Sequence, residues 1–95
     1  MCTWIKSELQ KVNRKKVEII PSPYFMRKNV QFWEQEYIDK TIRYGKLYPK
    51  KSTYGSRRIC FKLYFKEIHK TYFVVVIMNI NFIKIITRYN ENGKY

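Results

Sequence analysis

TYFVVVIMNINFIKIITRY, residues 71–89, is the stretch that decides the fold of this chain. Thirteen of its nineteen residues are apolar, but Lys84 lies inside the segment, where a membrane-spanning helix carries few or no charges. Ten of the nineteen are β-branched, and such side chains fit a pleated strand better than a helix. The stretch therefore predicts two strands, Tyr72–Met78 and Phe82–Tyr89, joined by a turn at Asn79–Asn81.

The second of these strands ends on Thr-Arg-Tyr, and its side chains alternate between two faces. A regular strand places Ile83, Ile85 and Thr87 on one face and Lys84, Ile86 and Arg88 on the other. A further strand over Arg57–Glu67 alternates apolar and polar residues in the same way, with Arg58 on its polar face. We expect Arg58 and Arg88 to converge on one concave basic surface near Tyr89.

Helices and short segments are predicted before this three-strand meander. In chain order they are a helical extension over residues 1–15, a short strand at Val17–Ile20, a helix that Ser22-Pro23 starts and that ends near Asn29, and a helix from Val30 to Ile42 that Gly45 caps. The composition of residues 46–56 predicts a loop, and residues 90–95 are expected to form a flexible tail. The fold class is therefore α+β in a single domain over 1–95. A small antiparallel sheet, made of the C-terminal meander and a short N-terminal strand, packs against two or three helices.

The charge of the chain points to a polyanionic partner. Its formal net charge is +13 over 95 residues, which disfavours the compact state through self-repulsion. Nucleic acid is the first candidate partner, an acidic protein the second and an anionic membrane surface the third. No stretch of the chain qualifies as a membrane span, so we expect no membrane insertion.

Basic and aromatic residues are interleaved between Asp39 and Glu67. This interval holds nine lysines and arginines, four tyrosines and no acidic residue. Cations bind phosphates and release counterions, while aromatic rings stack on unpaired bases. The pattern favours single-stranded RNA, or mRNA, over a DNA groove. The candidate nucleic-acid-binding residues are Arg27, Lys28, Arg43, Lys46, Arg57, Lys62 and Tyr54.

Few residues of the chain could hold a metal or a cofactor. It has one histidine, two cysteines and no paired carboxylates, so a zinc site is not expected, and neither is a cofactor. Cys2 and Cys60 are expected to be reduced thiols, as in a cytoplasmic protein. His69 falls in a predicted turn, which favours a surface role over a catalytic one.

The order of elements and several local sequences resemble the RelE/ParE-type toxin superfamily of toxin–antitoxin systems, particularly its BrnT-like and related branches. The similar stretches are SPYFMRK at 22–28, YIDKTIRYG at 37–45, the basic pair Arg57-Arg58, and VVVI with IKIITRY at the end of the chain. Together they run from about Val17 to Tyr89. The order of elements and the closing Ile-Thr-Arg-Tyr carry this resemblance, and no single motif is specific to the superfamily.

The resemblance implies a metal-independent endoribonuclease that an acidic antitoxin segment neutralises. In such a reaction the RNA 2′-hydroxyl attacks the adjacent phosphate, arginines stabilise the phosphoryl charge, and other groups transfer protons. The matching catalytic residues would be Arg58 and Arg88 as phosphate clamps, with Tyr89 and Lys50 or Lys51 for proton transfer. Some members of the superfamily act on gyrase instead of RNA. A non-catalytic nucleic-acid-binding module is the alternative from a different functional class.

Overall fold

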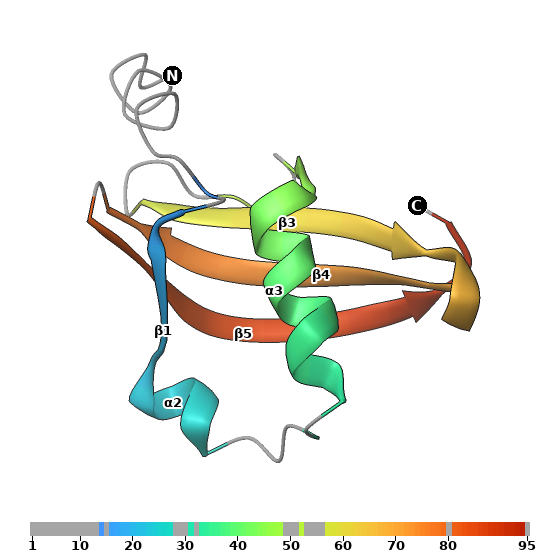
Figure 1. Cartoon of the computed structure of the whole chain (residues 1–95), viewed down its shortest axis with the longest axis horizontal. Coiled ribbons are helices and arrows are strands. Elements are labelled where there is room, and N and C mark those ends of the chain that lie inside the picture. Colours follow the sequence, from blue (N-terminus) through green and yellow to red (C-terminus); the bar gives the residue numbers. More distant parts are fainter. Residues whose placement is uncertain are drawn as a thin grey trace.

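The computed structural model of the chain is a five-stranded sheet with one helix lying across it (Figure 1). It describes Arg14, residues 16–27, Gln31, residues 33–48, Ser52, residues 57–79 and residues 81–94. The strand order is β1-β5-β4-β3-β2. The strands are β1 Glu18–Pro21, β2 Lys46–Leu47, β3 Arg58–Phe65, β4 Lys70–Met78 and β5 Phe82–Asn92. The helices are α2 Pro23–Met26, α3 Glu34–Tyr44 and the 3-10 turn η3 Lys66–Ile68.

The two strands predicted within residues 71–89 are confirmed as β4 and β5, which pair antiparallel. β4 is largely buried on both faces, as expected for a strand with a neighbour on each side. The sequence prediction put the end of the last strand at Tyr89 and a flexible tail at 90–95. In the structure β5 runs on to Asn92, and the N–H of Gly93 then donates to the carbonyl of His69 at 2.8 Å.

A β-bulge interrupts the pairing of β4 with β5. Val75 lies opposite Thr87 and Val76 lies opposite Ile85, so Ile86 is the extra residue. A one-residue insertion exchanges the faces of every side chain that follows it. Arg88 therefore lies opposite Val74, on the same face as Ile85, and not on the face of Lys84.

The predicted fold class is wrong in the make-up of the sheet. β1 pairs parallel with β5, so the sheet is mixed and not antiparallel. Lys46–Leu47 was assigned to a loop, but it adds a fifth strand beside β3. A two-residue strand has no periodicity of its own, and its pairing comes only from the neighbouring strand.

The predicted number of helices is wrong as well. Ser22 is confirmed as an N-cap, since its Oγ accepts the N–H of Phe25 at 3.1 Å, yet α2 is a single turn. A cap marks where a helix starts and does not set its length. Within the described ranges α3 is the one helix longer than a turn. The helical extension predicted over 1–15 lies outside the described residues, apart from Arg14.

The core lies between α3 and the face of the sheet that it covers. Ile42 of α3, Ile59 of β3, Val74 and Val76 of β4, and Ile83 of β5 have no exposed surface. Full burial of one such aliphatic side chain contributes about 1.5–3 kcal/mol relative to exposure. This packing fixes which face of the sheet remains for a ligand.

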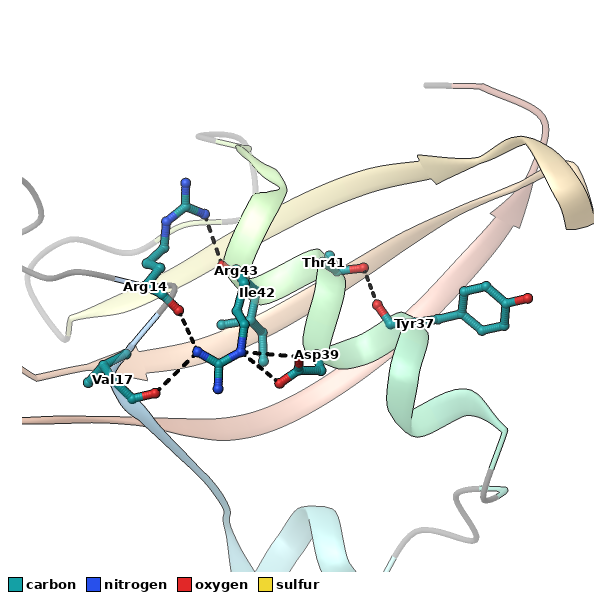
Figure 2. A network of polar contacts seen from close by, with 7 residues as sticks. All are labelled: Arg14, Val17, Tyr37, Asp39, Thr41, Ile42 and Arg43. Carbon is teal, nitrogen blue, oxygen red and sulfur yellow. Dashed lines mark hydrogen bonds and ion pairs between the residues drawn. The ribbon is translucent and has the colours of Figure 1, made fainter.

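Two arginines attach the segment before β1 to α3 (Figure 2). The Nη1 of Arg14 donates to the carbonyls of Ile42 (3.0 Å) and Gly45 (2.9 Å), which lie at the C-terminal end of α3. The Nη1 of Arg43 donates to the carbonyl of Arg14 at 2.9 Å, and its Nε pairs with Asp39 at 3.0 Å. Cationic donors at the last carbonyls of a helix also complement its dipole. Arg43 therefore serves as an anchor of the fold.

Candidate nucleic-acid interface

The side of the sheet opposite α3 carries four of the candidate site residues, Lys46, Arg58, Lys62 and Tyr89, and we call it the far face. Strand register defines it, because residues paired across strands share a face. Arg58, Ile77 and Lys84 form one row across β3, β4 and β5, and Lys46, Lys62, Phe73 and Tyr89 form a second. The far face includes these two rows together with Tyr48, Tyr64 and Val75, and the acids Glu18 and Glu91 lie at its margins.

Four strand residues of the far face are cations, Lys46, Arg58, Lys62 and Lys84, and the Nζ of Lys94 lies 5.9 Å from the ring centroid of Tyr64. Lys46 and Lys62 are direct cross-strand partners, an arrangement of like charges that is destabilising by itself. In the part of the chain that the structure describes, ion pairs form at Lys40, Arg43 and Arg88, and none forms at these four. The two acids on this side, Glu18 and Glu91, lie near opposite ends of β5. The middle of the far face is therefore positively charged.

Three aromatic rings cross the far face in a row. Phe73 is 4.7 Å from Tyr89, centroid to centroid, with the two rings almost parallel, and 5.3 Å from Tyr48 on its other side. Phe73 is buried between them, while Tyr48 and Tyr89 are partly exposed. The Nζ of Lys62 lies 4.9 Å from the centroid of Tyr48, within the range of a cation–π contact. We call Tyr48, Phe73 and Tyr89 the aromatic row.

Neither the aromatic row nor Lys84 was among the nucleic-acid-binding residues predicted from the sequence. The alternation of β5 did place Lys84 on an outer face, so that signal was present. The row itself had no local signal, because Tyr48 follows β2, Phe73 lies on β4 and Tyr89 lies on β5, and the three meet only when these strands align.

Arg88 lies on the α3 side of the sheet, away from the far face. Its Nε donates to the Glu34 Oε2 at 2.8 Å, and both side chains are mostly buried, with 20% and 11% of their surface exposed. The prediction that Arg58 and Arg88 converge on one surface is therefore wrong. The bulge at Ile86 is the reason, because it moves Arg88 to the face opposite Arg58.

Tyr89 does lie on the far face, but its ionisation does not suit a general base. Burial, as the largest cause, raises the pKa of the Tyr89 phenol above its ordinary value. The phenol therefore stays protonated at neutral pH, where it can donate a hydrogen bond but cannot readily accept a proton. The predicted catalytic set of Arg58, Arg88 and Tyr89 is not assembled.

The remaining residues predicted from the sequence are not gathered on the far face. Arg57 precedes β3 with a positive φ of 61°, and Arg27 is exposed after α2. Arg43, predicted to bind nucleic acid, is instead committed to Asp39 and to backbone carbonyls. His69, which we expected at the surface, is exposed. Four predicted residues lie outside the described residues: Lys28, Lys50, Lys51 and Tyr54.

A buried tyrosine beside the Arg88–Glu34 pair yields a test of pH dependence. Tyr72 is 1% exposed and stacks on Tyr37, and burial, followed by the Glu34 charge, raises its pKa above 10.0. A raised folded-state pKa stabilises the protein below the unfolded-state pKa, and that stabilisation is lost as pH rises through the folded value. We expect Tyr72→Phe to flatten the fall in urea-unfolding free energy above about pH 10. A fall as steep as that of the wild type would contradict this expectation.

A groove of about 1140 Å³ lies between α3 and the β1–α2 segment. Its floor includes Ile19, Phe25 and Ile85, and Glu36 and Asp39 lie on its wall. Both carboxylates are paired within α3, with Lys40 and Arg43 respectively. An apolar groove with acidic groups on its wall is a poor site for phosphate, so the far face remains the better candidate.

No metal site and no membrane span emerge from the described part of the chain. Within it, no group of three or more histidine, cysteine or carboxylate side chains is arranged to hold an ion. The helices of those same ranges lack the length and hydropathy that a membrane crossing requires. Cys60 is a buried thiol whose Sγ lies 3.9 Å from the Phe61 carbonyl oxygen.

Comparison of the chain with protein-family models, with curated proteins and with solved structures found no match in any of the three. The resemblance to the RelE/ParE-type superfamily therefore stays a prediction from the sequence, and the function is inferred from the geometry of the far face.

Proposed function

We propose that this chain binds single-stranded nucleic acid, and RNA in particular, through the far face. The observation that carries the proposal is the gathering of Lys46, Arg58, Lys62 and Lys84 on one side of the sheet without ion pairs among the described residues. A polyanion would relieve the repulsion between Lys46 and Lys62, and each neutralised phosphate would release counterions.

The surface between these cations suits unpaired bases better than a duplex. Val75, Ile77, Tyr48 and Tyr89 are all partly exposed on the far face, next to the cations. Bases of a single strand can turn toward such apolar and aromatic groups while their phosphates meet the lysines. A duplex keeps its bases stacked inside and would contact the cations alone.

The proposal is limited to binding. Cleavage by the predicted set would need Arg88 at the ligand, but Arg88 is held by Glu34 on the other side of the sheet. The toxin activity and the acidic antitoxin that the resemblance implies stay predictions. Incubating RNA with the protein and examining it for 2′,3′-cyclic phosphate ends would test cleavage directly.

Removal of two far-face cations should weaken RNA binding and reduce its salt dependence. We expect Arg58→Gln/Lys62→Gln to lower affinity for a labelled oligouridine roughly tenfold at physiological salt, and to make the log–log salt slope shallower by about 1.4. The matched control is Lys40→Gln/Lys70→Gln, which removes the same charge from α3 and from the α3 side of β4. Fluorescence anisotropy across a salt series measures both quantities.

Two results would overturn the proposal. Equal losses of RNA affinity in the two double variants would mean that RNA binding depends on the net charge of the chain and not on one face of the sheet. Equally tight binding of polyglutamate, with the same salt slope, would identify an acidic protein as the partner instead of RNA.

A further inference from the structure

Two lysines of the far face are close enough to bind the same anion. Lys46 and Lys62 are direct cross-strand partners in the antiparallel pair of β2 and β3, where Cβ atoms lie about 4.5–5.5 Å apart. Arg58 and Lys84, the other two cationic strand residues of this face, lie on β3 and β5 with Ile77 of β4 between them. Neighbouring strands are about 4.8 Å apart, so the backbones of these two residues are about twice as far apart. Lys46 and Lys62 can therefore approach one phosphate group together, and we call them the lysine pair.

Tyr48 holds one of the two ammonium groups in place. The Nζ of Lys62 lies 4.9 Å from the ring centroid of Tyr48, a cation–π contact that restricts the lysine side chain. Tyr48 is itself fixed to β3, because its N–H donates to the Cys60 carbonyl at 2.8 Å. The Ser52 hydroxyl donates to the Tyr48 carbonyl and accepts the N–H of Cys60, both at 3.0 Å. An ammonium group that is already held in place loses less conformational freedom when it binds an anion.

The lysine pair lies at the border of the far face, away from its acids. β2 is an outer strand of the sheet and is two residues long. Glu18 and Glu91 belong to β1 and β5, and β4 separates both of those strands from β3. In the part of the chain that the structure describes, no carboxylate forms an ion pair with either lysine. The pair can therefore hold the end of a strand whose inner phosphates contact the other cations.

The two kinds of phosphate in a nucleic acid differ in charge. A phosphodiester inside the strand carries one negative charge, whereas a phosphate monoester carries about −1.5 to −2 at neutral pH. A diester thus neutralises half of the charge of the lysine pair, and a monoester neutralises most or all of it. The repulsion between two like charges on adjacent strands is relieved more fully by the monoester.

We propose that the lysine pair binds a terminal phosphate monoester of single-stranded RNA, so that the protein prefers strands with a phosphorylated end. The preference rests on RNA binding by the far face, which is the proposed function, and adds the class of RNA that binds best. A 5′-phosphate and a 3′-phosphate both supply the same doubly charged group. The binding step forms and breaks no covalent bond.

Fluorescence anisotropy with five forms of one internally labelled oligouridine tests the preference. The forms carry hydroxyl groups at both ends, a 5′-phosphate, a 3′-phosphate, or either of these phosphates as its methyl ester, which has a single charge. We expect the full chain to bind at least one monoester form about fivefold more tightly than the hydroxyl form. The matching methyl ester should gain less than about twofold, and the end that gives the larger gain identifies the source of the monoester.

Lys46→Gln separates the lysine pair from the rest of the far face. We expect this variant to lose the preference, so that it binds the monoester and hydroxyl forms within about twofold of each other. Lys46 is exposed, so the fold should tolerate the change. Lys84→Gln is the matched control, since it also removes one lysine from the far face. It should weaken the binding of all five forms by a similar factor and keep the preference.

Equal affinity of the wild type for all five forms would overturn this assignment and leave RNA binding by the far face intact. A preference that Lys46→Gln keeps, or that Lys84→Gln removes, would also overturn it, because the monoester would then bind elsewhere. Uridine 5′-monophosphate and uridine 3′-monophosphate provide a second measurement that does not require a whole strand to bind. At least one of them should shift the amide NMR signals of Lys46 and Lys62 more than uridine does, whether or not oligouridine binds, and shifts equal to those with uridine would contradict a phosphate site there.

Discussion

Replacement of Arg88 by alanine is expected to lower the free energy of unfolding by about 3 kcal/mol, because it leaves the largely buried Glu34 carboxylate without its partner. The two side chains meet at 2.8 Å with 20% and 11% exposure, so the loss should lie near the lower end for a buried pair. The pair also joins the first turn of α3 to β5. Urea unfolding followed by circular dichroism measures the effect.

Arg58→Ala is the matched control, since it removes an exposed arginine from the other side of the same sheet. We expect its unfolding free energy to stay within about 0.5 kcal/mol of the wild type. The two variants should rank the other way in RNA binding. Folded Arg88→Ala should bind RNA as the wild type does, and Arg58→Ala should bind it more weakly. If Arg88→Ala kept full stability and lost RNA binding, Arg88 would be a ligand contact and its assignment here would be wrong.

A double-mutant cycle separates the Arg88–Glu34 contact from other effects of the two substitutions. If the two side chains interact as the structure shows, Glu34→Ala/Arg88→Ala should lose less stability than the sum of the single variants, by about 0.5–3 kcal/mol. Additive losses would mean that each side chain acts through separate contacts.

Gly45→Ala is expected to destabilise the protein by about 3 kcal/mol through steric overlap. A Cβ at this position would collide with the backbone oxygen of Thr41 and would lie 2.8 Å from the backbone oxygen of Lys62. Neither atom can rotate away as a side-chain end could. Gly45 has φ −70° and ψ 164°, which any residue can adopt, so the cost arises from space and not from backbone strain.

Gly93→Ala provides the contrasting case. No atom lies within 4 Å of a Cβ built at Gly93, but its φ is +91°, which side chains other than glycine rarely adopt. We expect a loss of about 1–2 kcal/mol that Gly93→Asn partly restores, since asparagine tolerates positive φ better. Thermal unfolding of Gly45→Ala, Gly93→Ala and Gly93→Asn checks both expectations.

A Gly45→Ala variant as stable as the wild type would show that α3 and β3 can separate at this point.

The sequence alone was sufficient where the signal is local. The β-branched run at 71–89 predicted β4 and β5, because stiff side chains disfavour a helix whatever surrounds them. The alternation in Arg57–Glu67 predicted β3, which the structure has at Arg58–Phe65. Ser22-Pro23 and Gly45 marked one start and one end of a helix. The net charge of +13 likewise follows from the sequence without knowledge of the fold, and it is the reason for expecting a polyanionic partner.

The tertiary structure decided which of these residues meet. One extra residue, Ile86, moves Arg88 from the side of Arg58 to the side of α3, where Glu34 pairs with it. No sequence pattern marks that bulge, because its position depends on how β5 pairs with β4. The aromatic row, the parallel partner β1 and the crowding around Gly45 have the same origin. Each depends on contacts between residues far apart in the chain, and these exist only once the sheet has formed.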